Sequence, residues 1–337
     1  MIENIKKRLD SLLKEAQFET FFFESSASVK NKYCFDSLVK KGNSVFLVKV
    51  FPNIDNLNEN IIKAIKKLSL ILQSKPILVG IKNRYQNLED NTIYLREGLP
   101  FITLNTLENI LQDNIYPYIL ARRGGGVIFL DGNLMKSLRE QKNISRKEIS
   151  EEIGVTKRTI CSYENENMRP SQIIAKKILK ILENKSIFRK INLFNWHIKF
   201  QLDEKTHDET GELTEFESEL QDIFNHIGIS TIWYKKGQVP FEISLSSKNY
   251  TLGLEEEDNF YPLFSGVSEN ENDRITKLNI NNLMKFANLF HKNALFIVNN
   301  DFKIPDTFKK SQIPIVKLKN LENLDNEEEF VEIFKEN

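Results

Sequence analysis

The chain has 337 residues, of which 40% are hydrophobic and 24 are phenylalanine, so it can form two or three domains with buried cores. Its two cysteines, Cys34 and Cys161, lie far apart, which excludes a disulfide framework and a cysteine-based zinc site and indicates a reducing cytoplasm. No apolar run approaches the roughly twenty residues that cross a bilayer, and the charged N-terminal stretch is unlike a secretion signal, so we expect no membrane partner.

The net charge of zero is the balance of three unlike segments. Residues 1–119 hold 16 Lys and Arg against 13 Asp and Glu, residues 120–190 hold 16 against 8, and residues 191–337 hold 15 against 26. A basic segment between a near-neutral and an acidic one predicts that contact with a polyanion belongs to the middle of the chain. A solvated helical surface that is basic by chance is the alternative.

The first third of the chain is predicted to begin with a helix, because apolar residues recur at helical spacing from Ile2 to Leu13. The stretches FETFFFE, YCFDSLVKK and SVFLVKVF favour three strands, with Gly42 in a hairpin turn between the last two. A helix over residues 57–72 and a buried strand that starts at Pro76 follow. The predicted order is helix, three strands, helix, strand.

The last third repeats this order. LTEFESELQDIFNHIG predicts a helix that ends at Gly228, and ISTIWYKKG, VPFEISLSS and NYTLGLEEE predict strands. NINNLMKFANLFHKN predicts a second helix and ALFIVNN a fourth strand, and the tails over residues 99–111 and 313–325 are also alike. We interpret the two segments as a duplication; the general likeness of α/β domains of this size is the alternative.

The stretch PYILARRGGGVIFLDG, which leads into the middle helices, holds three consecutive glycines, 124–126; we interpret them as a joint because consecutive glycines hold regular structure poorly. Four short helices are predicted from about residue 131 to 183. Ser145 and Glu148 form a capping box at the start of the second helix, and Thr156 caps the third. Helix-turn-helix geometry needs a small residue, a turn residue with left-handed φ and flanking aliphatic residues; the sequence supplies them as Ser150, Gly154, Ile149, Val155 and Ile160.

In such a unit the third helix, residues 156–164, enters the major groove of duplex DNA. Lys157 and Arg158 can reach guanine edges or phosphates, Thr159 can touch a thymine methyl group, and Arg146 would sit over the phosphate backbone. A solvated charged face is the alternative. The predicted DNA-binding residues are Ser145, Arg146, Thr156, Lys157, Arg158, Thr159 and Ser162.

Residues 133–182 resemble the Cro/C1-type (Xre-like) helix-turn-helix domain. Arg146 stands where that family more often has Gln, which leaves readout at one base open, and Ser150 stands where Ala is commoner. The stretch YILARRGGGVIFLDGNLMKSLREQKNIS, followed by this motif, is similar to a family of archaeal transcriptional regulators that carry an Xre-like domain between two larger α/β segments. The resemblance covers essentially the whole chain and implies a DNA-binding regulator.

The element order of the flanking segments is also that of restriction-endonuclease-like folds, which need an acid on the second strand and Glu-x-Lys on the third. The first segment offers Asp36, but the third strand reads Leu47-Val48-Lys49, and one carboxylate holds Mg²⁺ poorly. The second segment offers Glu242 and then Gly253-Leu254-Glu255, without a lysine. We therefore expect degenerate domains with no catalytic residues, no metal and no cofactor.

The expected fold is α/β (α+β) and multidomain: restriction-endonuclease-like αβββαβ domains over residues 1–118 and 191–337 flank an all-α Cro/C1-type helix-turn-helix domain over residues 119–190. The expected function is sequence-specific regulation of transcription, by a protein that is not an enzyme and binds double-stranded DNA as a homodimer. The alternatives are a metal-dependent nuclease targeted by the helix-turn-helix, and a sensor of a small molecule or protein coupled to DNA binding.

Overall fold

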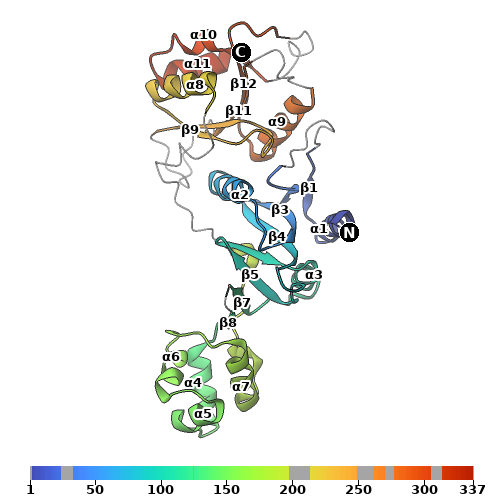
Figure 1. The fold of residues 1–337 in the computed structure, drawn as a ribbon, viewed down its shortest axis with the longest axis vertical. Coiled ribbons are helices and arrows are strands. Elements are labelled where there is room, and N and C mark those ends of the chain that lie inside the picture. The colour runs from blue at the N-terminus through green and yellow to red at the C-terminus, as the bar shows by residue number, and fades with distance from the viewer. Residues whose placement is uncertain are drawn as a thin grey trace. The chain divides into compact units, whose positions relative to one another are not determined.

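The computed structural model describes residues 2–23, 33–123, 125–196, 213–248, 261–269, 277–304 and 313–336. The chain forms two compact units (Figure 1). The first unit comprises Met1–Thr20, Val39–Leu57 and Lys75–Lys199, and the second comprises Phe21–Leu38, Asn58–Ser74 and Phe200–Asn337. No helix of the described ranges is long and apolar enough to span a membrane.

An eight-stranded sheet is built from the N-terminal third and the start of the middle segment. Its spatial order is β1-β2-β3-β4-β6-β5-β7-β8. β3 pairs with β4, β4 with β6 and β5 with β7 in parallel, whereas β5 pairs with β6 and β7 with β8 in antiparallel. The strands are β1 (Glu19–Phe21), β2 (Ser37–Lys41), β3 (Ser44–Asn53), β4 (Lys75–Lys82), β5 (Thr92–Arg96), β6 (Leu99–Ile102), β7 (Ile119–Arg122) and β8 (Gly125–Ile128).

The predicted order of helix, three strands, helix and strand is confirmed by α1 (Ile2–Glu15), β1, β2, β3, α2 (Glu59–Ile71) and β4. Gly42 has a φ of 58° in the turn between β2 and β3, as the hairpin requires. The core of the first unit packs Leu9, Leu12 and Leu13 of α1 against the sheet. The helix α3 (Leu104–Asp113), which follows β6, contributes Leu107 and Ile110 to the same core, so both helices cover this apolar surface.

The glycine joint expected at residues 124–126 is instead the start of a strand. Gly125 and Gly126 open β8 and pair with Arg122 and Ala121 of β7, while Gly124 lies outside the described residues. Gly125 has a φ of 137°, a conformation that side chains rarely allow, so glycine suits this end of the hairpin. The β7–β8 hairpin therefore extends the sheet and leads directly into the middle domain.

The four predicted helices of the middle segment are present, and we call them the four-helix domain. They are α4 (Gly132–Gln141), α5 (Arg146–Ile153), α6 (Lys157–Glu164) and α7 (Gln172–Leu182), followed by the 3-10 turns η1 (Lys185–Ile187) and η2 (Leu193–Asn195). After α7 the chain returns to the core of the sheet, because the ring of Phe194 lies 5.6 Å from that of Phe46 and 6.3 Å from that of Phe18. The four-helix domain is thus tied to the sheet at both of its ends.

The second unit contains a five-stranded sheet in the order β13-β12-β11-β10-β9. Its chain order again runs helix, three strands, helix, strand, which agrees with the predicted repetition. Phe216, Leu220 and Phe224 of α8 pack against the sheet. The elements are α8 (Glu215–His226), β9 (Ile229–Trp233), β10 (Ile243–Ser247), β11 (Leu263–Ser268), α9 (Lys277–Phe290), β12 (Ala294–Val298), β13 (Ile315–Lys317), α10 (Leu318–Leu321) and α11 (Glu327–Glu336).

The sequence did not predict the described strand between β10 and β12. NYTLGLEEE begins at residue 249 and lies outside the described residues, whereas the strand between β10 and β12 is Leu263–Ser268. The sequence reasoning missed Leu263–Ser268 because LFSGVS is an apolar run too short to stand out beside a longer alternating stretch. Gly253-Leu254-Glu255 therefore does not occupy the described third strand.

Residues 33–38 of the N-terminal third belong to the second unit. The Asn282 side chain donates a hydrogen bond to the Tyr33 hydroxyl over 3.1 Å, and the Cys34 backbone N–H donates to the Gln238 carbonyl over 2.6 Å. The rings of Phe35 and Phe286 lie 6.4 Å apart and nearly parallel. A segment distant in sequence thereby becomes part of this unit's core.

Candidate nucleic-acid interface

The start of α5 is fixed by the predicted capping box. The Ser145 hydroxyl accepts a hydrogen bond from the Glu148 backbone N–H over 3.2 Å, and the Glu148 carboxylate accepts one from the Ser145 backbone N–H over 2.6 Å. The hydrogen bonds of the Glu148 carboxylate with the backbone and the side chain of Ser145 lower the pKa of Glu148. Two backbone N–H groups at the N-terminus of α5, which have no partner within the helix, thereby gain hydrogen-bond acceptors, so α5 begins sharply at Arg146.

The turn between α5 and α6 has the geometry that the sequence predicts. Gly154 ends α5 with φ 80° and ψ 44°, in the left-handed region, and its N–H donates to the Ser150 carbonyl over 3.0 Å. Thr156 then caps α6 by accepting the Thr159 N–H over 3.1 Å. Ser150 is buried at the contact between α5 and α6, where the close approach of the two helices needs a small residue.

The inner faces of α5 and α6 hold the domain together. Ile149, Ile153 and Ile160 are almost completely buried and pack with Met135 of α4 and Ile178 of α7. Burial of each such side chain stabilises the domain by about 1.5–3 kcal/mol. The opposite face of α6 remains available for a partner.

The structure places most of the predicted DNA-binding side chains on the surface around the start of α6. Thr156, Lys157 and Arg158 are exposed, and Thr159 and Ser162 are half-buried. The Thr156 and Thr159 hydroxyls lie 2.9 Å apart and share a hydrogen bond. Across the parts of the chain that the structure describes, the Lys157 and Arg158 side chains make no hydrogen bond or ion pair, so both cations can contact a partner.

Arg146 occupies a different environment from the other predicted cations. Its Nε donates to the Glu164 carboxylate over 2.7 Å, and Arg139 Nε donates to the other oxygen of that carboxylate over 2.6 Å. The hydrogen bond and charge of Glu164 raise the pKa of Arg146. About a third of the Arg146 side chain is exposed, at 32%, whereas the Glu164 side chain is only 1% exposed.

This buried carboxylate is a feature that the sequence did not reveal. Glu164 at the end of α6 joins Arg139 of α4 to Arg146 of α5. The sequence did not indicate either arginine partner. Long-range ion pairs of this kind have no local sequence pattern, because the partners are 25 and 18 residues away.

Two further residues share the outward face of α6. Cys161 and Asn165 follow Lys157 at intervals of four residues, so they lie in one row along the helix. Asn165 Nδ2 lies 3.5 Å from Cys161 Sγ. Helical spacing alone could have added both to the predicted set.

The contact between α4 and the end of α6 leaves no room for a side chain at Gly132. A Cβ there would lie 2.0 Å from the Glu164 carbonyl oxygen. The Gly132 N–H donates to the Glu166 carboxylate over 3.2 Å. This close approach fixes the position of α6 relative to α4.

Among the described residues, the nuclease-like positions depart from the expected pattern at Leu47. Lys49 is buried in β3, but Leu47 stands fully buried where the second carboxylate would be needed. Asp36 directly precedes β2, and LFSGVS in β11 contains no charged residue. Within the described ranges, no group of three His, Cys, Asp or Glu residues is placed to hold a metal ion.

Glu242, the acid expected in the second copy, has a local partner. Its carboxylate accepts the Val267 backbone N–H over 3.1 Å, and its own N–H donates to the Ser265 carbonyl over 3.0 Å. Glu242 therefore links the start of β10 to β11 and has a structural use.

Comparison with known families agrees with this geometry. A family model described as a PD-(D/E)XK superfamily domain matches residues 2–117, and a helix-turn-helix model matches residues 135–187. These matches confirm the restriction-endonuclease-like fold of the N-terminal segment and the helix-turn-helix of the middle segment. No solved structure is significantly similar to the chain.

Similar proteins come from several archaea. A protein of Methanobrevibacter smithii is 28% identical over 330 residues, which cover 98% of this chain and 96% of the relative. A protein of Archaeoglobus fulgidus is 31% identical over 241 residues, which cover 71% of this chain and 74% of the relative. A protein of Methanocaldococcus jannaschii is 26% identical over 302 residues, which cover 90% of this chain and 88% of the relative. Each is named a "Putative HTH-type transcriptional regulatory protein".

Proposed function

The chain belongs to this family of archaeal HTH-type transcriptional regulatory proteins, and from that premise we propose that it recognises a specific duplex sequence by placing α6 in the major groove. The observation that carries the proposal is the pair of exposed cations, Lys157 and Arg158, in the first turn of α6. Residues at the N-terminal end of a recognition helix contact base edges, and arginine binds guanine through two hydrogen bonds.

The start of α5 supplies the phosphate contacts in this proposal. Ser145 is exposed at the N-cap, where backbone N–H groups and the helix dipole favour an anion. Arg146 presents its remaining N–H groups beside it while its Nε is held by Glu164. Such contacts position the protein on the duplex without reading sequence.

The active species is proposed to be a homodimer. One recognition helix covers only a few base pairs, so two helices about one helical turn apart are needed to specify a site. The predicted result of sedimentation of the full-length protein is a dimer, and the predicted operator is a palindrome. A monomer that binds asymmetric sites would contradict this part of the proposal.

The nuclease-like domains are proposed to be structural rather than catalytic. The support is Leu47, a buried hydrocarbon side chain on the strand where a metal-binding carboxylate is required. Without that ligand, little stabilisation of the attacking water or the leaving oxygen remains.

Selection of bound sequences from a random duplex pool tests the proposed function. The full-length protein should enrich one palindromic motif, and the Arg158→Ala variant should lose preference at a defined base pair of each half-site. Lys180→Ala, which removes an exposed cation from α7, is the matched control and should enrich the same motif as the natural protein. Enrichment of no motif by the natural protein would refute sequence-specific recognition.

A further inference from the structure

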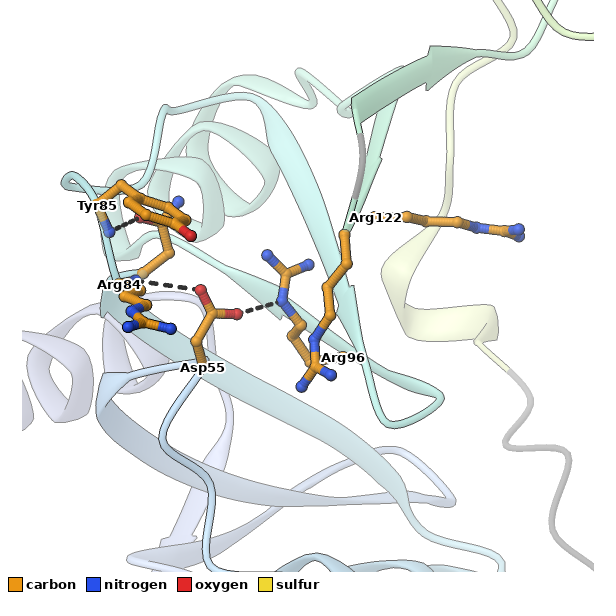
Figure 2. Close-up of a pocket in the computed structure, with 7 residues that line it drawn as sticks. Asp55, Arg84, Tyr85, Arg96 and Arg122 are labelled. Atoms are coloured by element: carbon orange, nitrogen blue, oxygen red, sulfur yellow. Dashed lines mark hydrogen bonds and ion pairs between the residues drawn. The ribbon is translucent and has the colours of Figure 1, made fainter.

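Two arginines of the first unit are held by carboxylates in the same way but differ in exposure. At the end of β5, Arg96 donates from Nε to Asp55 over 2.5 Å, and its side chain is only 7% exposed (Figure 2). Nη1 of Arg96 also donates to the Leu95 carbonyl over 3.0 Å. Arg146 at the start of α5 likewise donates from Nε, to Glu164, but its side chain is 32% exposed. Arg96 is therefore enclosed by its partners, whereas Arg146 remains accessible to a ligand.

The carboxylate that holds Arg146 is itself fixed. The Glu164 side chain is 1% exposed, and its other oxygen accepts a hydrogen bond from Arg139 Nε over 2.6 Å. Arg139 is anchored in turn, because its Nη1 donates to the Ile144 carbonyl over 2.8 Å. A buried acceptor with both oxygens engaged has little freedom to move, so Glu164 holds the guanidinium of Arg146 in one place.

Most of the hydrogen-bonding capacity of Arg146 is left over. The hydrogen bond to Glu164 uses one of the five N–H groups of the guanidinium. Within the described part of the chain, the two Nη groups of Arg146 donate no hydrogen bond. These two nitrogens form the outer end of the planar group, and that end matches two oxygens of one phosphate.

The pairing with Glu164 does not remove the attraction of Arg146 for an anion. Two arginines, Arg139 and Arg146, share this one buried carboxylate. The other carboxylate that pairs with Arg139 belongs to Glu140, whose side chain is 55% exposed, so solvent screens its charge. The group therefore keeps positive charge at the surface.

Arg146 also lies at the surface that is proposed to face the duplex. It is close enough to Cys161, on the outward face of α6, for an electrostatic interaction. Glu164, which holds it, is the last residue of α6, and the first turn of that helix carries the two exposed cations of the proposed recognition surface. The guanidinium thus links the two helices of the helix-turn-helix.

We propose that Glu164 is a positioning residue for DNA binding, which aims Arg146 so that both of its Nη groups bind one phosphate of the duplex backbone. This inference rests on the proposed function, which places Arg146 at a phosphate, and it assigns the orientation of that contact to a buried carboxylate. A side chain oriented in advance loses less conformational freedom on binding, so the contact is stronger than the same arginine makes without its carboxylate. Since phosphates carry no sequence information, the affinity for every duplex rises.

Anisotropy titrations of the full-length protein with a duplex selected from the random pool and a scrambled duplex test the contact. Arg146→Ala should weaken both by the same factor, about tenfold or more, because a charge-assisted contact without sequence information is lost. The slope of log K against log salt should become shallower by about 0.9, the value for one phosphate. Arg146→Lys should recover only part of the affinity, since an ammonium held by Glu164 cannot offer a phosphate two nitrogens. Arg8→Ala, which removes an arginine paired with Glu108, is the matched control and should leave both affinities unchanged.

The role of Glu164 is tested by its coupling to Arg146. Glu164→Gln alone should weaken both duplexes, whereas the same change in the Arg146→Ala background should have no further effect, because the carboxylate acts through that arginine. Hydrogen exchange of the α6 amides gives the folded fraction of each variant, and affinities are compared at a temperature where all variants are folded. Arg146→Lys needs no change at Glu164, so it decides the proposal even where Glu164→Gln leaves the domain unfolded.

Three results overturn the proposal. Equal losses from Glu164→Gln in both backgrounds give Glu164 a structural role only. An Arg146→Lys variant that binds as tightly as the natural protein shows that charge suffices without orientation, and a loss confined to the selected duplex assigns Arg146 to a base. The proposed function fails differently, through a natural protein that prefers no duplex; coupling of Glu164 with Arg146 in that protein leaves the positioning role standing.

Discussion

Glu164 is a single residue on which three helices of the four-helix domain depend. Its almost fully buried carboxylate lies within hydrogen-bonding distance of Arg139 on α4 and Arg146 on α5. Removal of one partner from a buried ion pair leaves an uncompensated charge, which costs about 3–5 kcal/mol. The network therefore contributes to the mutual placement of the two helices that form the motif.

Glu164→Gln is predicted to destabilise the four-helix domain by up to about 3–5 kcal/mol, because the buried Arg139 keeps only the more exposed Glu140 as a counter-charge. Hydrogen exchange of the α6 amides in the full-length protein measures this local opening. Glu183→Gln is the control, since Glu183 pairs with Lys142 at the surface, and it should change exchange little. Equal exchange in the natural protein and Glu164→Gln would show that the carboxylate has no stabilising role.

At the scale of the elements, the contact of α4 with the end of α6 excludes any side chain at Gly132. Gly132→Ala places a Cβ 2.0 Å from the Glu164 carbonyl, so the helices must separate, with a predicted loss of about 1–3 kcal/mol. The same hydrogen-exchange measurement detects the loss. Asn133→Ala, at the neighbouring exposed position, should be nearly neutral. An unperturbed Gly132→Ala would mean that the close approach is absent in solution.

The capping box of α5 predicts a pH dependence. The pKa of Glu148 is lowered in the folded protein, so its contribution to stability is fully present above the unfolded value, near 4.5, and is lost as the pH falls through the folded value. The stability difference between the natural protein and Glu148→Ala should be larger at pH 7 than at about pH 3. Exchange rates of the α5 amides report it. A stability difference that stays constant with pH would show that the Glu148 carboxylate does not stabilise α5 through the capping box.

Sequence patterns predicted the elements whose determinants are local. The capping box, the left-handed Gly154 and the alternation of helices and strands follow from spacing within one or two turns. The pairing of Glu164 with two arginines depends on how the helices pack, and the pairing of Asp55 with Arg96 depends on strand order; no local pattern contains either. The strand Leu263–Ser268 of the second sheet was missed for another reason, since a longer alternating stretch in the sequence drew attention from this short apolar one.

At the scale of the whole molecule, the chain combines a helix-turn-helix domain with a nuclease-like domain in which Leu47 stands at the acid position of the Glu-x-Lys pattern. Supercoiled plasmid incubated with the protein and Mg²⁺ or Mn²⁺ should therefore be nicked no faster than with the Asp36→Ala variant. Agarose electrophoresis measures the conversion. Metal-dependent nicking that disappears in Asp36→Ala would establish a nuclease and overturn the structural role of this domain.

We propose that the cations of α6 read base edges. The most direct measurement is the ratio of affinities for a selected duplex and a scrambled duplex of equal length, obtained by anisotropy titration at one salt concentration. The natural protein should show a ratio of about 10³ or more, and the Lys157→Ala, Arg158→Ala double variant should lose most of it while staying folded. Equal binding of both duplexes by the natural protein, or an unchanged ratio in the double variant, would contradict the account.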